Sequence, residues 1–232
     1  MAKHQYTPYH NEVLAKINAA SPVIPAQRRA FKQGFSFSKQ PFEQQLAIWD
    51  HIWKHNDNFR TRLHAYLFLE DCVTKQELHD QLWKTSVSWQ EDINDWGLCD
   101  ALAKVNTKVL ETHPDTVYKQ LSHWNKDKNL WKRRQSVVSL LYYSRTKKVF
   151  LPFEQITALI QPLLADQEYY VQKGVGWTLR ELHNVYPRKM LPFLRSNIHS
   201  VSPIAFTTAI EKIGAEKEAL KEMRKANRIS HK

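Results

Sequence analysis

An aromatic side chain and a carboxylate lie one helical turn apart near the middle of the sequence. Trp96 and Asp100 are four residues apart, so on a helix they share one face. On the helix predicted for residues 89–110, this face also carries Lys104 and Thr107 and lies opposite an apolar stripe. Aromatic rings bind cations and a carboxylate attracts them. The pair is therefore suited to stabilise positive charge; the alternative is an incidental tryptophan beside a first-turn acid.

A second tryptophan lies on the polar side of the helix predicted for residues 168–186. Trp177 lies roughly opposite the apolar stripe of this helix. Its neighbours on the helical wheel are polar: Tyr170, Lys173, Arg180 and Asn184. A tryptophan among cations and away from the core indicates a binding surface, and packing on the next helix is the alternative.

A third predicted helix, residues 128–145, carries an arginine on its apolar face. Arg134 falls among Leu130, Val137 and other apolar residues. Because an unpaired buried charge is costly, Arg134 needs an anionic partner, either a structural salt bridge or a phosphate. Lys132 and Arg133 lie at the edges of this face and would strengthen an anion site.

The net charge narrows the choice of partner. The chain has 34 Lys and Arg against 23 Asp and Glu, a net charge of +11. Such an excess favours a polyanion, which can be DNA, RNA or an acidic membrane surface. A basic protein whose charge is incidental is the alternative.

The elements that would position these residues are helices. A helix is predicted after Ser38, which would be its N-cap, with Pro41 in the first turn and Phe42, Leu46, Trp49 and Trp53 at helical spacing. Further helices are predicted near residues 58–70, 74–84, 89–110, 115–124, 128–145, 153–165, 168–186, 189–198, 203–213 and 215–227.

The pattern of many short helices predicts an all-α fold. No strand-like alternation is visible, and five glycines are few for a fold built on tight turns. Short helices without long linkers are typical of an α-solenoid of stacked HEAT or armadillo pairs, although no clean internal repeat is visible. We expect one domain over residues 1–232, with a basic C-terminal tail from about 217 to 232.

Three segments resemble motifs of the AlkD-like family of DNA alkylation repair proteins. Residues Tyr169–Glu181, followed by Tyr186 and Pro187, resemble the family signature. Asn129-Leu-Trp-Lys-Arg-Arg134 resembles an upstream motif, and Trp96-Gly-Leu-Cys-Asp100 resembles a Trp-x-x-x-Asp motif. The resemblance is concentrated in residues 96–187, and residues 201–208 are more apolar than the basic segment that active members tend to carry.

The resemblance implies a curved solenoid of HEAT-like repeats that binds duplex DNA. It also implies excision of N3- or N7-alkylated purines by hydrolysis of the N-glycosidic bond, with the base left stacked. In this sequence the implied catalytic residues are Asp100, Trp96 and Trp177, and the implied phosphate clamp is Arg134. We expect the DNA-binding residues to be Arg134, Arg133, Lys132, Lys173 and Arg180. A non-catalytic solenoid that recognises DNA shape or branched DNA is the alternative, and a protein–protein scaffold is a remote third.

Other features of the sequence argue against a membrane-spanning segment, a metal site and a cofactor. The sequence has no run of about 18 apolar residues, and its first residues lack the apolar stretch of a signal peptide. Cys72 and Cys99 are isolated, which argues against a disulfide framework or a zinc site. We therefore expect a cytoplasmic monomer.

Two short patterns have simpler explanations. His51 and His55 are spaced to share a metal ion, but no third ligand is evident, so solvated histidines are favoured. Gly174-Val-Gly176 lies inside a predicted helix and lacks the third glycine of a nucleotide-binding loop. Close approach of a helix or of DNA explains these glycines better.

Overall fold

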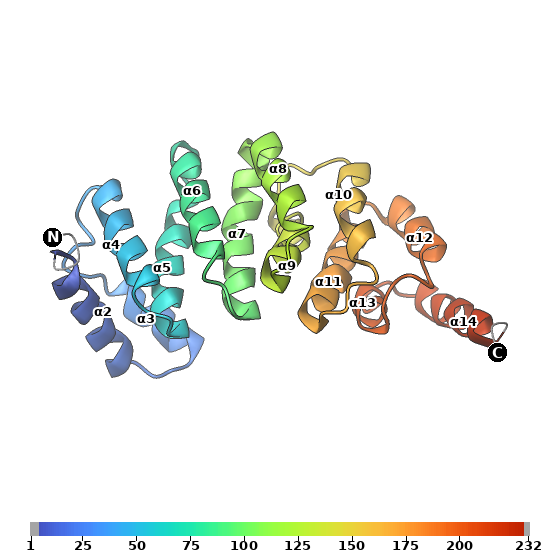
Figure 1. Cartoon of the computed structure of the whole chain (residues 1–232), viewed down its shortest axis with the longest axis horizontal. Helices are drawn as coiled ribbons and strands as arrows, with labels where there is room; N and C mark the ends of the chain where they lie inside the picture. Colours follow the sequence, from blue (N-terminus) through green and yellow to red (C-terminus); the bar gives the residue numbers. More distant parts are fainter. Residues whose placement is uncertain (1–4, 230–232) are drawn as a thin grey trace. The chain divides into compact units, whose positions relative to one another are not determined.

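The computed structural model describes residues 5–229, except for the side chains of 227–229. Every regular element in the described part is a helix, so the predicted all-α fold is confirmed (Figure 1). The chain divides into two compact units, Met1–Asn94 and Asp95–Lys232, which are described separately below. The single domain expected over residues 1–232 stays a prediction.

The first unit is built around α5. Its helices are α2 (Thr7–Ala19), α3 (Ile24–Lys32), α4 (Phe42–Lys54), α5 (Phe59–Cys72) and α6 (His79–Gln90), with a 3-10 turn, η1 (Gln76–Leu78), before α6. Helices α2, α3 and α4 all contact α5. The core is rich in aromatic side chains: Trp53 and Trp89 are fully buried and stack with ring centroids 4.3 Å apart. Helices α2 and α3 were not expected from the sequence.

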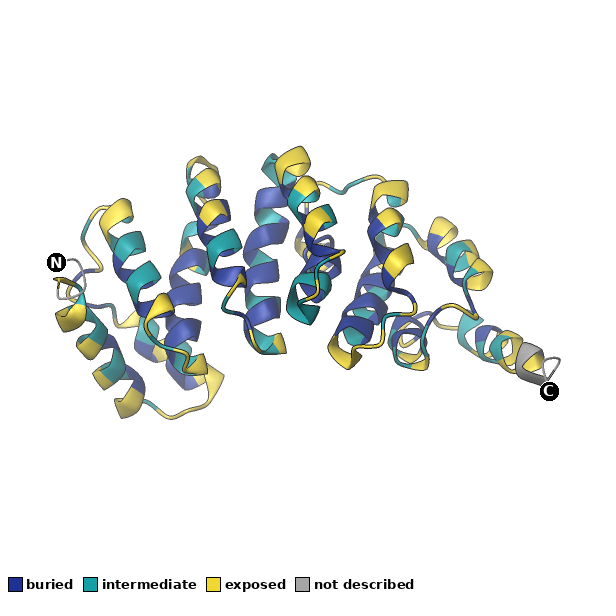
Figure 2. Ribbon diagram, in the orientation of Figure 1, coloured by how far each residue is buried: buried dark blue, intermediate teal, exposed yellow. Residues whose placement is uncertain are grey.

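The second unit has two layers of helices. The first layer contains α7 (Trp96–Thr112), α9 (Leu130–Val138), α11 (Tyr169–Val185) and α13 (Pro203–Ala209), which pack in that order. The second contains α8 (Pro114–Trp124), α10 (Phe153–Ile160) and α12 (Pro187–Ser196). Helices α7 and α11 are largely buried, whereas α12 exposes much of its surface (Figure 2).

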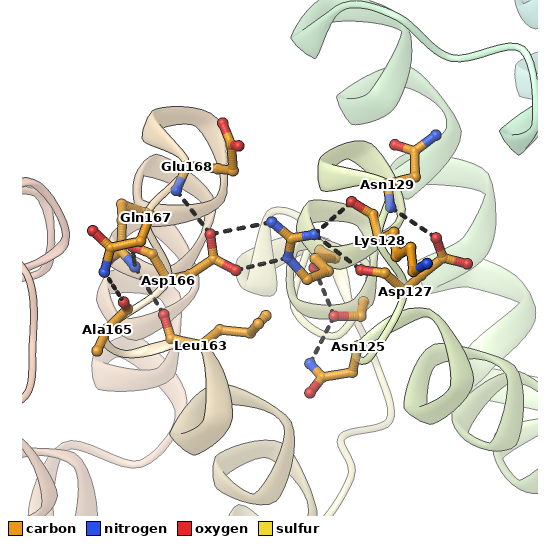
Figure 3. A network of polar contacts seen from close by, with 12 residues as sticks. Asn125, Asp127, Lys128, Asn129, Leu163, Ala165, Asp166, Gln167 and Glu168 are labelled. Atoms are coloured by element: carbon orange, nitrogen blue, oxygen red, sulfur yellow. Dashed lines mark hydrogen bonds and ion pairs between the residues drawn. The ribbon is translucent and has the colours of Figure 1, made fainter.

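The start of α9 contains a polar network that ties three segments together. Asn129 is the N-cap of α9 and accepts a hydrogen bond from Trp131 N, while Asn129 N donates to Asp127 Oδ1 (2.8 Å). Four residues after the cap, Arg133 donates to the carbonyls of Asp127 and Lys128 (both 2.9 Å) and to both carboxylate oxygens of Asp166 (Figure 3). Because Asp166 precedes α11, Arg133 links the starts of two neighbouring helices.

The same hydrogen-bonding arrangement at a helix start recurs at α11 and, in the first unit, at α5. Four residues after their N-caps, Gln172 and Arg62 donate to the carbonyl of the residue two positions before the cap, at 2.7 and 3.1 Å. Each then reaches the next segment: Gln172 accepts from Ser202 Oγ and Arg62 donates to Asp92 O. The N-caps of α5, α7, α9, α11 and α13 lie 37, 34, 39 and 34 residues apart. The chain therefore contains a helical repeat that the sequence did not reveal.

Several predicted helices are shorter in the structure, and the physical cause is clear for two of them. The helix expected over 89–110 begins only at Trp96, because α6 ends at Gln90 and Asp95 caps α7 by accepting from Leu98 N (3.0 Å). The helix expected over 128–145 ends at Val138 and is followed by turns and by η2 (Ser144–Thr146). Ser38 does not cap α4; its hydroxyl accepts from Phe35 N, and Pro41 occupies the N-cap position.

The C-terminal part of the second unit is packed and ordered by specific contacts. Residues Gln161–Leu163 form a 3-10 turn, η3, after α10, and α14 spans Glu216–Ile229. Leu220 of α14 is buried, and Arg224 donates to the carbonyls of Ile198 and Val201 (2.9 and 2.7 Å). The predicted basic tail is thus largely a docked helix, and its last residues, 230–232, lie outside the described residues.

Gly176 allows α11 and α13 to approach closely. A Cβ atom at this position would lie 2.5 Å from the carbonyl oxygen of Ala205 and 2.7 Å from the Cβ of Thr208. Any larger residue would push the two helices apart. Close helix approach therefore explains this glycine.

Candidate active site

Three charged side chains occupy the same position in three successive helices. Asp100, Arg134 and Lys173 are each the fifth residue after the N-cap of α7, α9 and α11. Because these helices pack side by side, the repeat aligns one carboxylate and two cations across the first layer. The repeat therefore explains how residues more than 30 positions apart reach one site.

Asp100 and Arg134 form a two-pronged ion pair. Arg134 Nη2 lies 2.8 and 3.0 Å from the two carboxylate oxygens of Asp100, and its Nε lies 3.1 Å from Oδ1. Its remaining terminal nitrogen, Nη1, donates to Tyr170 O (2.6 Å). The Arg134 side chain is 7% exposed and that of Asp100 is 26% exposed. Of the two partners expected for the buried Arg134, a salt bridge within the chain is the one observed.

Burial governs the protonation of Asp100. Desolvation raises the pKa of its carboxyl above the ordinary value, and the neighbouring Arg134 guanidinium partly offsets this effect. Asp100 therefore takes up a proton at a higher pH than an exposed aspartate does.

The ion pair lies in the wall of a cavity of about 480 Å³. All the residues that line it belong to the second unit, namely Trp96, Asp100, Arg134, Tyr169, Tyr170, Lys173, Trp177, Arg180, Thr208 and Glu211. Asp100, Trp96 and Trp177, the three expected catalytic residues, are therefore together. Such a hollow can accept a planar or sugar-like group beside a carboxylate.

The two tryptophans differ in their surroundings. Trp96 is 55% exposed at the start of α7. Trp177 is half-buried, and its ring contacts Tyr142 and Tyr143, with centroid distances of 5.6 and 5.9 Å. Trp177 thus lines the cavity and also packs on the segment that follows α9, and its role in a binding surface stays a prediction.

Two further cations in the cavity wall are held by the segment around α13. Lys173 Nζ lies 3.4 Å from Thr208 Oγ1, and Arg180 forms an ion pair with Glu211. The apolar segment 201–208 therefore contributes α13 and one hydroxyl to the site. Arg134 and Arg180 both have a carboxylate partner from the chain itself.

The structure does not bring Lys132 and Arg133 into the cavity wall. Arg133 is engaged in the network at the start of α9 that Figure 3 shows. Lys132 Nζ lies 3.4 Å from Asp127 Oδ2. Their role in DNA binding stays a prediction.

Several residues of the site were not identified from the sequence. Tyr169, Thr208 and Glu211 line the cavity, yet nothing in the local pattern marks Thr208 or Glu211. Tyr169 is adjacent to the polar face that carries Trp177, which is a weak signal. Glu211 lies in a turn after α13 and reaches the cavity only through tertiary packing.

The described residues contain no group of three or more His, Cys, Asp or Glu side chains suited to hold a metal ion. His51 and His55 stack with ring centroids 4.0 Å apart. Within residues 5–229, no helix is long and apolar enough to cross a bilayer.

The fold and the cavity define a protein of helical repeats with a site of aromatic, acidic and basic residues. A family model described as DNA alkylation repair enzyme matches residues 4–213. The chain therefore belongs to this family.

The solved structures that are similar to the chain include two from Streptococcus mutans. One is the crystal structure of AlkD2 from Streptococcus mutans, with a TM-score of 0.65 and 16% identity over 91% of this chain and 100% of that one. The other is the crystal structure of smu.31 from Streptococcus mutans UA159, with a TM-score of 0.59 and 17% identity over 92% of this chain and 100% of that one. At these identities the likeness establishes a shared fold. No curated protein sequence matches the chain.

Proposed function

We propose that the protein is a DNA glycosylase that removes N3- or N7-alkylated purines from duplex DNA by hydrolysing the N-glycosidic bond. The observation that carries this proposal is the carboxylate of Asp100 in the same cavity as Trp96 and Trp177. Membership of the DNA alkylation repair enzyme family supports it.

The side chains suit the chemistry of a cationic lesion. Alkylation at N3 or N7 makes the purine positively charged, so the leaving base needs no strong general acid. As the bond breaks, positive charge develops on the deoxyribose. A carboxylate stabilises such an oxocarbenium ion and can orient the attacking water. Each tryptophan face adds about 0.5–2 kcal/mol of cation binding.

The positive charge of the second unit supports duplex DNA as the partner. Residues 95–232 contain 23 Lys and Arg against 13 Asp and Glu. Lys173, Arg180 and Arg134 lie in or beside the cavity wall and are our candidates for phosphate contacts. Such contacts position the duplex without reading its sequence.

One observation favours the non-catalytic alternative. The Asp100 carboxylate is already paired with Arg134 through three contacts, and a neutralised carboxylate attracts a developing cation less strongly. A protein that only binds DNA would tolerate this pair unchanged. In the glycosylase, a phosphate that draws Arg134 away would release Asp100 for catalysis.

The deciding experiment is a base-release assay. The full chain is incubated with duplex DNA that contains 7-methylguanine or 3-methyladenine, and released bases are separated by chromatography. We expect enzyme-dependent release of at least one alkylpurine in single-turnover conditions. Salt-dependent binding to the same duplex without release of either base would contradict the glycosylase and favour the binding protein.

A further inference from the structure

The segment after α9 holds a tyrosine in an unusual backbone conformation. Among the described residues other than glycine, Tyr143 alone has a positive φ, at 45°. This left-handed region is unfavourable for a residue with a bulky side chain. A strained backbone persists only where the surrounding structure enforces it, and such strain concentrates at functional sites.

Buried polar contacts enforce this conformation from the following residues. Ser144 donates from its amide and its hydroxyl to the carboxylate of Glu181 on α11, at 2.8 and 2.6 Å. Lys147 Nζ donates to the carbonyl and the hydroxyl oxygen of Thr107 on α7, both at 3.0 Å. The segment is therefore fastened to two helices that also carry the site.

Core packing does not account for the strain. The side chain of Tyr143 remains 46% exposed. Its ring meets the ring of Trp177 edge to face, with centroids 5.9 Å apart and an interplanar angle of 88°. The fold thus holds an exposed aromatic ring beside a tryptophan that lines the cavity.

We propose that Tyr143 is a DNA-contacting residue, a third aromatic side chain that packs against the nucleotide next to the one that Trp177 meets. The inference rests on the proposed function in requiring duplex DNA as the partner, but it does not require excision. Tyr143 would add an aromatic contact and not a cation, so its contribution is separable from that of the phosphate-binding cations.

The test uses Tyr143→Asn, since asparagine adopts the left-handed conformation more readily than tyrosine does. Affinity for duplex DNA is measured over a salt series together with the melting temperature. We expect affinity to fall about fivefold or more, taking as the scale the lower end of what an aromatic contact contributes to single-strand binding. The slope of log affinity against log salt should stay unchanged, because no phosphate contact is lost. The melting temperature should hold or rise.

Two further variants sharpen the result. Tyr143→Phe keeps the ring and should bind DNA like the wild type. Tyr118→Asn is a matched control on α8, where the tyrosine hydroxyl donates to Gln155 O and lies outside the cavity wall, and it should leave DNA affinity unchanged.

The outcomes separate this inference from the proposed function. Weakened binding by Tyr143→Asn supports the inference even if the wild type releases no base. Normal binding by Tyr143→Asn, with or without a lower melting temperature, overturns the inference and leaves the glycosylase standing. A wild type that does not bind duplex DNA overturns both.

Discussion

The two units share the same hydrogen-bonding arrangement at helix starts, but they differ in their net charge and in the tryptophan side chains that they expose. Residues 1–94 hold 11 Lys and Arg against 10 Asp and Glu, whereas residues 95–232 hold 23 against 13. The four tryptophans of the first unit are all buried, while Trp96 of the second unit is exposed and Trp177 is half-buried. Nearly all the excess positive charge and the accessible tryptophan surface therefore belong to the second unit.

The difference is clearest at one position of the repeat. The fifth residue after the N-cap is Leu63 in α5 and is buried. In α7, α9 and α11 the same position holds Asp100, Arg134 and Lys173. Since Arg62 and Arg133 tie their helix starts in the same way, the scaffold is common to both units and the site comes from substitutions on it. A fold of this kind thus specifies a place for a site, and the residues at that place decide its chemistry.

The largest effect is expected for Asp100→Asn. If the second unit carries the catalysis, the single-turnover rate of 7-methylguanine release should fall by at least about a hundredfold, because an amide does not offset a developing cation. Stability should also fall, by about 1–3 kcal/mol, since the buried Arg134 loses its ionic partner. Unfolding by denaturant measures this second quantity.

The matched control lies in the first unit. Glu70 pairs there with Arg28 and accepts from Tyr66. Glu70→Gln should lower stability while leaving base release per folded molecule unchanged. If both variants reduce release equally, the loss reflects stability alone and Asp100 is not part of the chemistry.

The next effect concerns the first unit and its response to acid. His64 is fully buried, and desolvation lowers its pKa from 6.5 to about 4. Below pH 6.5 the unfolded chain binds a proton that the folded chain does not, so stability is lost as the pH falls from about 6.5 to 4. The loss is at most about 3 kcal/mol. Denaturant unfolding at pH 7 and pH 4.5 measures it, and His64→Gln should reduce the difference.

The sequence predicted the second unit better than the first, for physical reasons. Amphipathic helices such as α7 and α11 follow from their apolar stripes, and Trp96, Asp100 and Trp177 were singled out because they oppose those stripes. The predicted start of α7 was too early because Asp95 caps this helix locally. The predicted end of α9 was too late because Ser144 and Lys147, in the segment after the helix, form tertiary hydrogen bonds. Hydropathy does not encode these.

The sequence also could not show which residues pair with the charged side chains. The apolar face of α9 showed that Arg134 needs an anion, but spacing alone left a phosphate and a carboxylate equally open. The ion pair with Asp100 depends on the alignment of α7 and α9 by the repeat. The sequence did not show this repeat because the residue four positions after the N-cap differs in type from helix to helix. It is Arg62 in α5, Cys99 in α7, Arg133 in α9 and Gln172 in α11.

A smaller effect is expected when one cation of the site is removed. Lys173→Gln should weaken binding to duplex DNA about fivefold at moderate salt and reduce the slope of log affinity against log salt by about 0.9, the value of one phosphate contact. Lys75→Gln removes the same charge from the exposed surface of the first unit and should change neither quantity appreciably. Equal losses for the two variants would mean that net charge, and not the location of the site, governs binding.

The smallest expected effect tests whether a carboxylate of the chain competes with DNA for a cation of the site. Arg180 is paired with Glu211, whose side chain is 56% exposed, and both line the cavity. A DNA phosphate must compete with this carboxylate for the guanidinium. Glu211→Gln should therefore tighten DNA binding a few fold and steepen the salt slope by about 0.9, as Arg180 becomes available to one more phosphate. Glu211 is exposed, but the Arg180 side chain is only 17% exposed, so losing the pair should lower stability by about 1 kcal/mol. Glu77→Gln, an exposed acid of the first unit, makes the same change in net charge and should leave the slope unaltered. Weaker binding by Glu211→Gln would instead show that the pair holds Arg180 in the position that DNA requires.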